Sequence, residues 1–265
     1  MAPPRPRGFH AVRTDIQSSR TARFTGSRPP LPVLVALVSD IHGNLHAFER
    51  ALADIDTRGV DQIVCLGDIV GYGPDPEACV ALARDRCDLT VLGNHDAAVA
   101  LESGLDVLPK DGRVAALRHR EWLSGDALDW LAARPLRIDR PEATYVHASP
   151  NHPEDWERLD SFPAVRAQFA AFDAPICFVG HSHKPAVASS SVGVFKVRPG
   201  HRFLVDVGSV GQPRDHDPRL SYGLYDTEAF SVETVRLHYD VARTAARVHE
   251  RGLPDGLGAR LRRGV

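Results

Sequence analysis

The chain has 265 residues, of which 43% are hydrophobic, so it is long enough to bury a full core as one large domain or two small ones. Its formal net charge of −2 argues against a surface built for nucleic acid or for an anionic membrane. No stretch of the sequence approaches the roughly 18 apolar residues that a membrane span requires. We therefore expect no membrane association and no stable nucleic-acid partner.

The first thirty residues differ in composition from the rest of the chain. They combine proline, serine and six arginines, carry a net charge of +5, and show almost no apolar periodicity. Such a segment cannot bury enough apolar surface to fold, and it lacks the apolar stretch of a secretory signal. We predict a disordered tail over residues 1–30 and one domain over residues 31–265.

The four cysteines indicate a reducing environment. Cys65, Cys79, Cys87 and Cys177 show no CxxC spacing, and Cys65 and Cys177 lie inside apolar runs, as core-filling thiols do. Reduced thiols favour a cytoplasmic location.

The first part of the domain alternates strands and helices. A continuous apolar run at 33–38 predicts a strand covered on both faces, and Asn44 can cap a helix whose apolar face spans 45–55. The pattern repeats with a strand at 62–66, a helix at 76–86 and a strand at 89–92. Residues 97–133 then indicate a mainly helical insertion, with Val114 and Leu117 among its expected core contacts, which we expect to cap the site.

The second part of the domain is richer in strands. They are predicted at 136–138, 144–147, 176–179, 186–189, 193–198, 203–207, 220–226 and 230–237. Helices are expected at 163–172 and 240–251, followed by a solvated basic terminus that contains Arg260, Arg262 and Arg263. Alternating strand–helix units followed by a run of strands favour an α/β fold with two sheets packed face to face and helices outside.

Polar side chains of metal-ligand type follow five of the predicted strands. They are Asp40, His42, Asp68, Asn94, His95, His147, His181 and His183. Because ligands gather at the carboxyl ends of strands in α/β sheets, we expect these residues to meet in space. A carboxylate such as Asp68 can bridge two cations, and the mixed nitrogen and oxygen set suits Mn, Fe, Zn, Ni or Co better than Ca or Mg.

These blocks resemble the signature of the calcineurin-like metallophosphoesterase superfamily. The segments Leu66–Pro76, Val91–Asp96 and Gly208–Asp215 are similar to its small bacterial phosphodiesterase-type branch. The resemblance implies a four-layer αββα sandwich with two mixed sheets and two divalent metal ions, most often Mn²⁺. It also implies the ligands: Asp40, His42, Asp68 and His183 for the first ion, and Asp68, Asn94, His147 and His181 for the second.

The resemblance also implies a reaction. A hydroxide that bridges the two metals would attack the phosphorus of a phosphate ester, without a protein nucleophile. His95 is not a ligand in the family pattern, and we expect it to donate a proton to the leaving oxygen or to stabilise it. A catalytically inactive scaffold would be expected to lack His95 or a ligand, and this chain keeps all of them.

One departure from the family bears on the substrate. Where protein phosphatases of the superfamily carry an orienting aspartate and a phosphate-clamping arginine, this chain has Gly71-Tyr72-Gly73. A monoester dianion benefits most from an arginine fork, so we expect a phosphodiesterase acting on a small phosphoester or nucleotide. A dinucleoside polyphosphate hydrolase and a phosphoprotein phosphatase are the alternatives.

Three residues are candidates for contacts with the substrate. His119 and Arg214 are possible replacements for the missing groups, and Tyr72 either stacks on a base or packs in the core. The loop Gly208–Asp215 either cradles phosphate or forms a tight turn, and we favour the turn.

Overall fold

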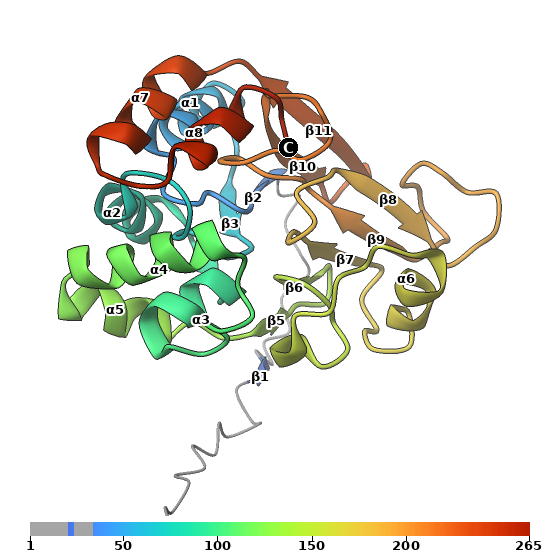
Figure 1. Ribbon diagram of the computed structural model, residues 1–265. Helices are drawn as coiled ribbons and strands as arrows, with labels where there is room; N and C mark the ends of the chain where they lie inside the picture. The colour runs from blue at the N-terminus through green and yellow to red at the C-terminus, as the bar shows by residue number, and fades with distance from the viewer. Residues whose placement is uncertain (1–20, 24–33) are drawn as a thin grey trace, which may run out of the picture.

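The computed structural model describes residues 21–23 and 34–265. The strands are β1 (Thr21–Arg23), β2 (Leu34–Val38), β3 (Gln62–Cys65), β4 (Leu89–Thr90), β5 (Arg137–Asp139), β6 (Thr144–Val146), β7 (Ile176–Val179), β8 (Ala186–Ser189), β9 (Phe203–Asp206), β10 (Leu220–Asp226) and β11 (Ser231–Leu237). The helices are α1 (Leu45–Asp56), α2 (Pro76–Arg86), α3 (Asn94–Leu101), α4 (Lys110–Trp122), α5 (Gly125–Ala132), α6 (Phe162–Gln168), α7 (Val241–Glu250) and α8 (Asp255–Leu261), with a 3₁₀ turn at Pro153–Asp155. Figure 1 shows their arrangement.

The strands form two mixed sheets. One has the order β11-β10-β2-β3-β4, in which β2, β3 and β4 are parallel and β10 is antiparallel to both of its neighbours. The other has the order β1-β5-β6-β7-β9-β8, with β6, β7 and β9 parallel. The three parallel strands in each sheet end at the same edge, so the loops that follow them lie close together.

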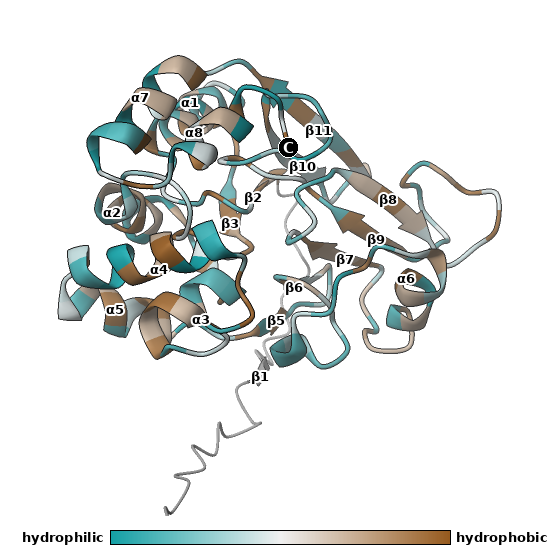
Figure 2. Cartoon of the chain, in the orientation of Figure 1, coloured by the Kyte–Doolittle hydropathy of each residue, from teal (hydrophilic) through white to brown (hydrophobic). Residues whose placement is uncertain are grey.

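Strands that are apolar on both faces explain the layering. In β2, Val35 and Leu37 join the core between the two sheets, whereas Ala36 and Val38 join the core under the helices. Outside the other sheet, Phe169 and Phe172 near α6 cover Cys177 and its neighbours. Helices therefore lie on the outer side of each sheet (Figure 1), and strands such as β7 and β9 are largely hydrophobic in Figure 2. The predicted four-layer αββα sandwich is confirmed.

The first helix shows how local sequence signals and packing agree. The Asn44 side chain accepts a hydrogen bond from the Ala47 N–H at 3.2 Å and so caps α1, as predicted. Phe48, Leu52 and Ile55 lie on one face of the helix and are buried against the sheet.

Three expectations about the elements are wrong. Residues 193–198 form an irregular loop rather than a strand. The C-terminal residues form the helix α8, in which Leu257 and Leu261 are buried, although Arg262 and Arg263 after it are exposed as expected of a solvated end. Val114 and Leu117 are 37% and 44% exposed, because α4 buries the face that carries Gly112, Ala115 and Ala116 instead.

The segment 97–133 is mainly helical, comprising most of α3 together with α4 and α5. The predicted disordered tail lies outside the described residues except for Thr21–Arg23, which form β1. In the part of the chain that the structure describes, every helix is too short or too polar to cross a lipid bilayer.

Candidate metal centre

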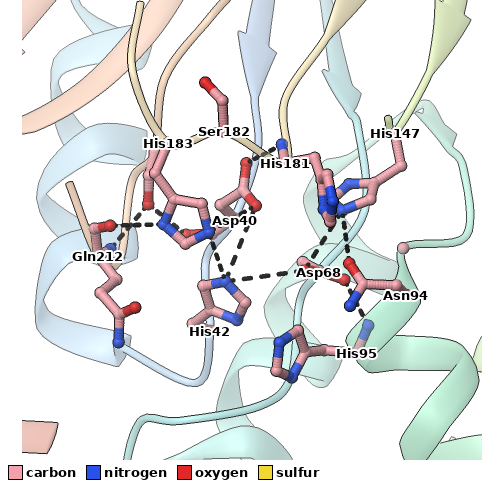
Figure 3. Close-up of polar contacts among 12 residues, drawn as sticks. Asp40, His42, Asp68, Asn94, His95, His147, His181, Ser182, His183 and Gln212 are labelled. Atoms are coloured by element: carbon pink, nitrogen blue, oxygen red, sulfur yellow. Dashed lines mark hydrogen bonds and ion pairs between the residues drawn. The ribbon is translucent and has the colours of Figure 1, made fainter. Parts of the chain in front are cut away.

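The polar residues predicted at the strand ends meet at one edge of the sandwich. Asp40 follows β2, Asp68 follows β3, and Asn94 begins α3 just beyond β4. His147 directly follows β6, and His181 and His183 follow β7. Figure 3 shows these side chains pointing toward one another from both sheets. The structure therefore brings together all seven residues expected to hold metals.

One part of the cluster consists of Asp40, His42 and His183, all buried. The Nε2 atom of His183 lies 3.2 Å from Asp40 Oδ1 and 3.2 Å from the Nε2 atom of His42. His42 Nε2 lies 3.8 Å from Asp40 Oδ1. These ligand atoms are close enough to one another to share a single ion.

The other part consists of Asp68, His147 and His181, with Asn94 beside them. His147 Nε2 lies 3.3 Å from Asp68 Oδ2 and 3.2 Å from Asn94 Oδ1. The ring centroids of His147 and His181 are 5.1 Å apart. Asp68 Oδ2 is also 3.7 Å from His42 Nε2, so this carboxylate lies between the two parts (Figure 3).

Backbone carbonyls orient three of the imidazole rings. The Nδ1–H groups of His42, His147 and His183 donate to the carbonyl oxygens of Val70, Leu66 and Gln212, at 3.0, 2.8 and 2.5 Å. A carbonyl can only accept, so in a neutral ring the Nε2 atom carries the lone pair.

The resulting arrangement of lone pairs fits a cation. Two neutral rings, His42 and His183, direct Nε2 atoms at each other across 3.2 Å, and Asp40 Oδ1 nearby is buried without a hydrogen-bond donor. Such a grouping is repulsive unless a proton or a metal ion lies among these atoms. The donor set of imidazole nitrogens and carboxylate oxygens matches first-row divalent metals.

The charges of the site are strongly coupled. Burial and the nearby charge of Asp68 together raise the pKa of Asp40 to about 6, although the charge of His147 opposes the rise. Burial alone would lower the pKa of His147, but the charge and hydrogen bond of Asp68 outweigh it and raise this pKa to about 10. A metal ion that binds this ring therefore competes with a proton.

The backbone of the site is unusual. Asp40, His42, Asp68, His181 and His183 have φ angles between 50° and 67°, in the left-handed region that L-residues rarely adopt. Each such residue costs on the order of 1 kcal/mol or more unless the surrounding structure enforces it. The loop Gly208–Asp215 provides part of that enforcement, since Gly211 N–H and the Ser209 hydroxyl both donate to the Asp40 carbonyl, at 2.9 and 2.8 Å. These contacts support the interpretation of this loop as a turn.

His95 lies next to the cluster, and only its backbone forms a hydrogen bond with a proposed ligand. Its backbone N–H donates to Asp68 Oδ1 at 2.8 Å, but its buried Nδ1 atom has no hydrogen-bond partner. Its ring centroid is 4.9 Å from that of His42 and 4.4 Å from that of Tyr72. A Cβ at Gly71 would lie 2.5 Å from His95 Nδ1, so glycine is required there. Burial lowers the pKa of His95 to about 4, although the charge of Asp68 opposes the shift.

His119 holds the segment Gly71-Tyr72-Gly73 in place. Its Nδ1 accepts from the Gly71 N–H at 2.9 Å, and its Nε2–H donates to the Gly73 carbonyl at 2.8 Å. The ring is fully buried, and both of its nitrogens are occupied. The expectation that His119 contacts substrate does not fit this geometry, because the side chain has no polar atom left to offer.

The other two candidates for substrate contacts lie together. Tyr72 is only 3% exposed, so it packs rather than presenting a stacking face for a base. The Arg214 guanidinium lies over its ring, with Cζ 5.5 Å from the centroid, and donates to Gln212 Oε1 at 2.7 Å. Arg214 is half-buried and remains available to a ligand.

Two nearby residues were not predicted. Arg260 of α8 also lies over Tyr72, at 5.7 Å from the ring centroid, and Trp156 lies 6.0 Å from the ring of His147. No signal in the sequence marked Arg260, since α8 itself was not predicted.

Known proteins resemble this chain over most of its length. Protein MJ0912 of Methanocaldococcus jannaschii is 39% identical over 238 residues, which cover 86% of this chain and 97% of that protein. The crystal structure of a metallophosphoesterase from Sphaerobacter thermophilus has a TM-score of 0.78 at 37% identity, and the match covers 89% of this chain and 100% of the other.

A more distant relative matches only part of the chain. The symmetrical bis(5'-nucleosyl)-tetraphosphatase of Thioalkalivibrio sulfidiphilus is 28% identical over 124 residues, 45% of this chain and 46% of that protein. Residues 33–229 match the family described as the calcineurin-like phosphoesterase superfamily domain. The chain therefore belongs to the calcineurin-like phosphoesterase superfamily and is a metal-dependent hydrolase of phosphoric esters.

Proposed function

We propose that this protein is a phosphodiesterase with a dinuclear metal centre. The observation that carries the proposal is the position of Asp68, whose Oδ2 lies 3.7 Å from His42 Nε2 on one side and 3.3 Å from His147 Nε2 on the other. A carboxylate so placed can serve two ions. Asp40, His42, Asp68 and His183 would hold the first ion, and Asp68, Asn94, His147 and His181 the second.

The metal ions, when bound, activate water and neutralise phosphoryl oxygens. The rest of the chemistry falls to the side chains of this chain. His95 lies beside Asp68 and His42, where its imidazole can donate a proton or a hydrogen bond to the leaving oxygen. Gly71 makes room for that ring, and His119 fixes the Gly71 backbone.

The loop at Gly71-Tyr72-Gly73 supports a diester rather than a monoester. His119 and Tyr72 fill the space around this loop, and neither provides a fork for a phosphate dianion. A nucleoside polyphosphate hydrolase is the second candidate, supported by the partial similarity to the Thioalkalivibrio tetraphosphatase. In either case Arg214 is our candidate for a contact with the substrate.

The donor atoms of the site and the cysteines support a choice of metal and of cellular compartment. The mixed nitrogen and oxygen donors suit Mn²⁺, with Fe, Zn, Ni or Co as further candidates. All four cysteines are free thiols, which supports a reducing, cytoplasmic compartment.

The test is direct. Purified protein loaded with Mn²⁺ should hydrolyse bis-(p-nitrophenyl) phosphate faster than p-nitrophenyl phosphate, and a panel of cyclic nucleotides, dinucleoside polyphosphates and phosphopeptides would then rank natural substrate classes. A metal-loaded preparation that is inert toward diesters, monoesters and dinucleotides alike would refute the proposal.

A further inference from the structure

Two arginine side chains from distant parts of the chain both lie over the ring of Tyr72. Arg214 comes from the loop after β9, and Arg260 comes from α8, which lies beside α7 (Figure 1). Their Cζ atoms lie 5.5 and 5.7 Å from the Tyr72 ring centroid. Leu257 of α8 packs in the same small apolar cluster as Tyr72, so the helix is anchored at this place.

Neither guanidinium is neutralised by an acidic side chain. Among the described residues, no Asp or Glu side chain lies within ion-pair distance of Arg214 or Arg260, although Asp111 of α4 acts on Arg260 from farther away and Arg260 Nε lies 2.6 Å from an oxygen of Val265, the last residue of the sequence. On α7 and just beyond it, by contrast, Arg247 pairs with Asp75 at 3.0 Å and Arg251 with Glu77 at 2.8 Å. Arg214 and Arg260 thus differ from Arg247 and Arg251, two arginines of the same C-terminal part of the chain.

Most N–H groups of the two arginines also have no hydrogen-bond acceptor among the described residues. Arg214 donates only to Gln212 Oε1, and Arg260 donates only through Nε, to the Val265 carbonyl at 2.6 Å, counting partners among the described residues. Both terminal nitrogens of Arg260 are therefore available. Two planar guanidinium groups with free N–H donors match the oxygens of a phosphate.

The two like charges disfavour each other. Burial lowers the pKa of Arg260, and the charge of Arg214 lowers it further. Half-buried cations that act on each other in this way are stabilised by a nearby anion.

Their position relates them to the metal centre. The Tyr72 ring that carries both arginines lies 4.8 Å from the ring of His42 and 4.4 Å from that of His95, measured between centroids. The charge of Arg214 also lowers the pKa values of His42, His95 and His183, all on the same side of the cluster. The arginines therefore lie near the metal centre, on the side of His42 and His95, and an anion held by them would be close to a phosphate bound there.

We propose that Arg214 and Arg260 form a subsite for a second, non-scissile phosphate of the substrate. The proposal rests on the phosphoester-hydrolysing function of the adjacent cluster and narrows its substrate to a phosphodiester, or a phosphoanhydride chain, that carries a further phosphate group. Tyr72 serves as the apolar floor that sets the spacing between this subsite and His42.

Binding of an anion tests the subsite without catalysis. Isothermal titration calorimetry of metal-depleted protein with inorganic pyrophosphate should show binding that weakens about tenfold or more in Arg260→Gln and in Arg214→Gln, since each removes a charge-assisted contact. Arg260→Lys should lie between, because it keeps the charge and loses the fork. Arg262→Gln is the matched control, an exposed arginine at the end of the same helix, and should bind like the wild type.

Kinetics with a matched pair of substrates tests its specificity. Thymidine 5'-(p-nitrophenyl phosphate) and its 3'-phosphorylated form differ by one phosphate that is not cleaved. The metal-loaded wild type should prefer the phosphorylated form by about tenfold in kcat/KM, and Arg260→Gln should reduce that ratio to near one. Thermal melts of each variant show whether it is folded.

The possible failures are distinguishable. Equal pyrophosphate binding by wild type and both glutamine variants, or the absence of any preference in an enzyme that cleaves bis-(p-nitrophenyl) phosphate, would overturn the subsite and leave the phosphodiesterase intact. Loss of all hydrolysis, with arginine-dependent pyrophosphate binding retained, would overturn the phosphodiesterase and leave the anion site.

Discussion

The loops after the parallel strands and the surface formed by α8 contribute to the same region in different ways. The loops hold Asp40, His42, Asp68 and the other proposed ligands, several of which are oriented by hydrogen bonds to the backbone. The α8 surface brings Arg260 to Tyr72 only because Leu257 and Leu261 bury the helix. The first arrangement can be recognised from short sequence motifs, whereas the second arises only from tertiary packing.

This difference suggests a division of labour. The residues of the loops would perform the chemistry that all members of the superfamily share, and they are recognisable as short motifs. The arginines over Tyr72 would select the substrate, and they depend on how a terminal helix packs. Changes to the two regions should therefore have separable effects.

The largest effect is expected from Asp68→Asn, which removes the charge shared by both parts of the cluster. Hydrolysis of bis-(p-nitrophenyl) phosphate with Mn²⁺ should fall by about 10³-fold or more, and bound metal should decrease in elemental analysis. Asp85→Asn changes an exposed aspartate on α2 and should leave both unchanged. An Asp68→Asn protein with full metal content and near-normal turnover would contradict the dinuclear assignment.

His95→Ala should affect the reaction without affecting the metals. Turnover should fall by about 10² to 10⁴-fold, because the leaving oxygen loses its proton or hydrogen-bond donor. Metal content should match that of the wild type and of His249→Ala, a change at an exposed histidine. Loss of metal in His95→Ala would instead show that His95 is a ligand, as its proximity to His42 and Asp68 would permit.

Leu257→Ala should affect stability rather than chemistry. Removing a buried side chain from the cluster around Tyr72 should lower the free energy of unfolding by about 3 kcal/mol, measured by urea denaturation. Leu101→Ala, at a leucine that is 49% exposed, should change it by less than about 0.5 kcal/mol. Bound metal in folded Leu257→Ala should be normal, and a loss of metal would show that the two regions are not independent.

Metal ions should stabilise the fold through the loops alone. Mn²⁺ at a concentration 100 times its dissociation constant should raise the free energy of unfolding by about 2.7 kcal/mol. Chelation should reverse this gain, Leu257→Ala should retain it, and Asp68→Asn should lose most of it. Equal stabilisation of Asp68→Asn and wild type in thermal or urea melts would indicate that the ions bind elsewhere.

Much of the fold was predictable because local signals and packing agreed. The apolar run at 33–38 became β2, and Asn44 capped α1 as its side chain allowed. The proposed ligands were predictable as a group because parallel strands deliver their carboxyl ends to one edge, which requires no knowledge of individual contacts.

The predictions that were wrong or absent have physical reasons. The helix α8 contains Gly256 and Gly258, which disfavour helices, and a Cβ at Gly258 would lie 3.1 Å from the Ala245 carbonyl oxygen on α7. Gly258 therefore allows α8 to pack closely against α7, although a glycine in the sequence argues against a helix. In α4, the large apolar residues Val114 and Leu117 were expected to face the core, but they are exposed. The face of α4 that is buried carries small residues, because Tyr72 lies too close to Gly112 for a larger side chain. His119 gave no local sign that it would bond to Gly71 and Gly73, because those partners lie more than forty residues away in the chain.

The left-handed backbone of the site bears on attempts to move this chemistry to another protein. Grafting Asp40, His42, Asp68, His181 and His183 as side chains onto ordinary loops would fail, because their directions depend on φ angles between 50° and 67°. A recipient scaffold would need the supporting turn at Gly208–Asp215 as well, since its hydrogen bonds to the Asp40 carbonyl hold one of these conformations. The transferable unit is thus a set of interlocked loops, with the ligands as only one part of it.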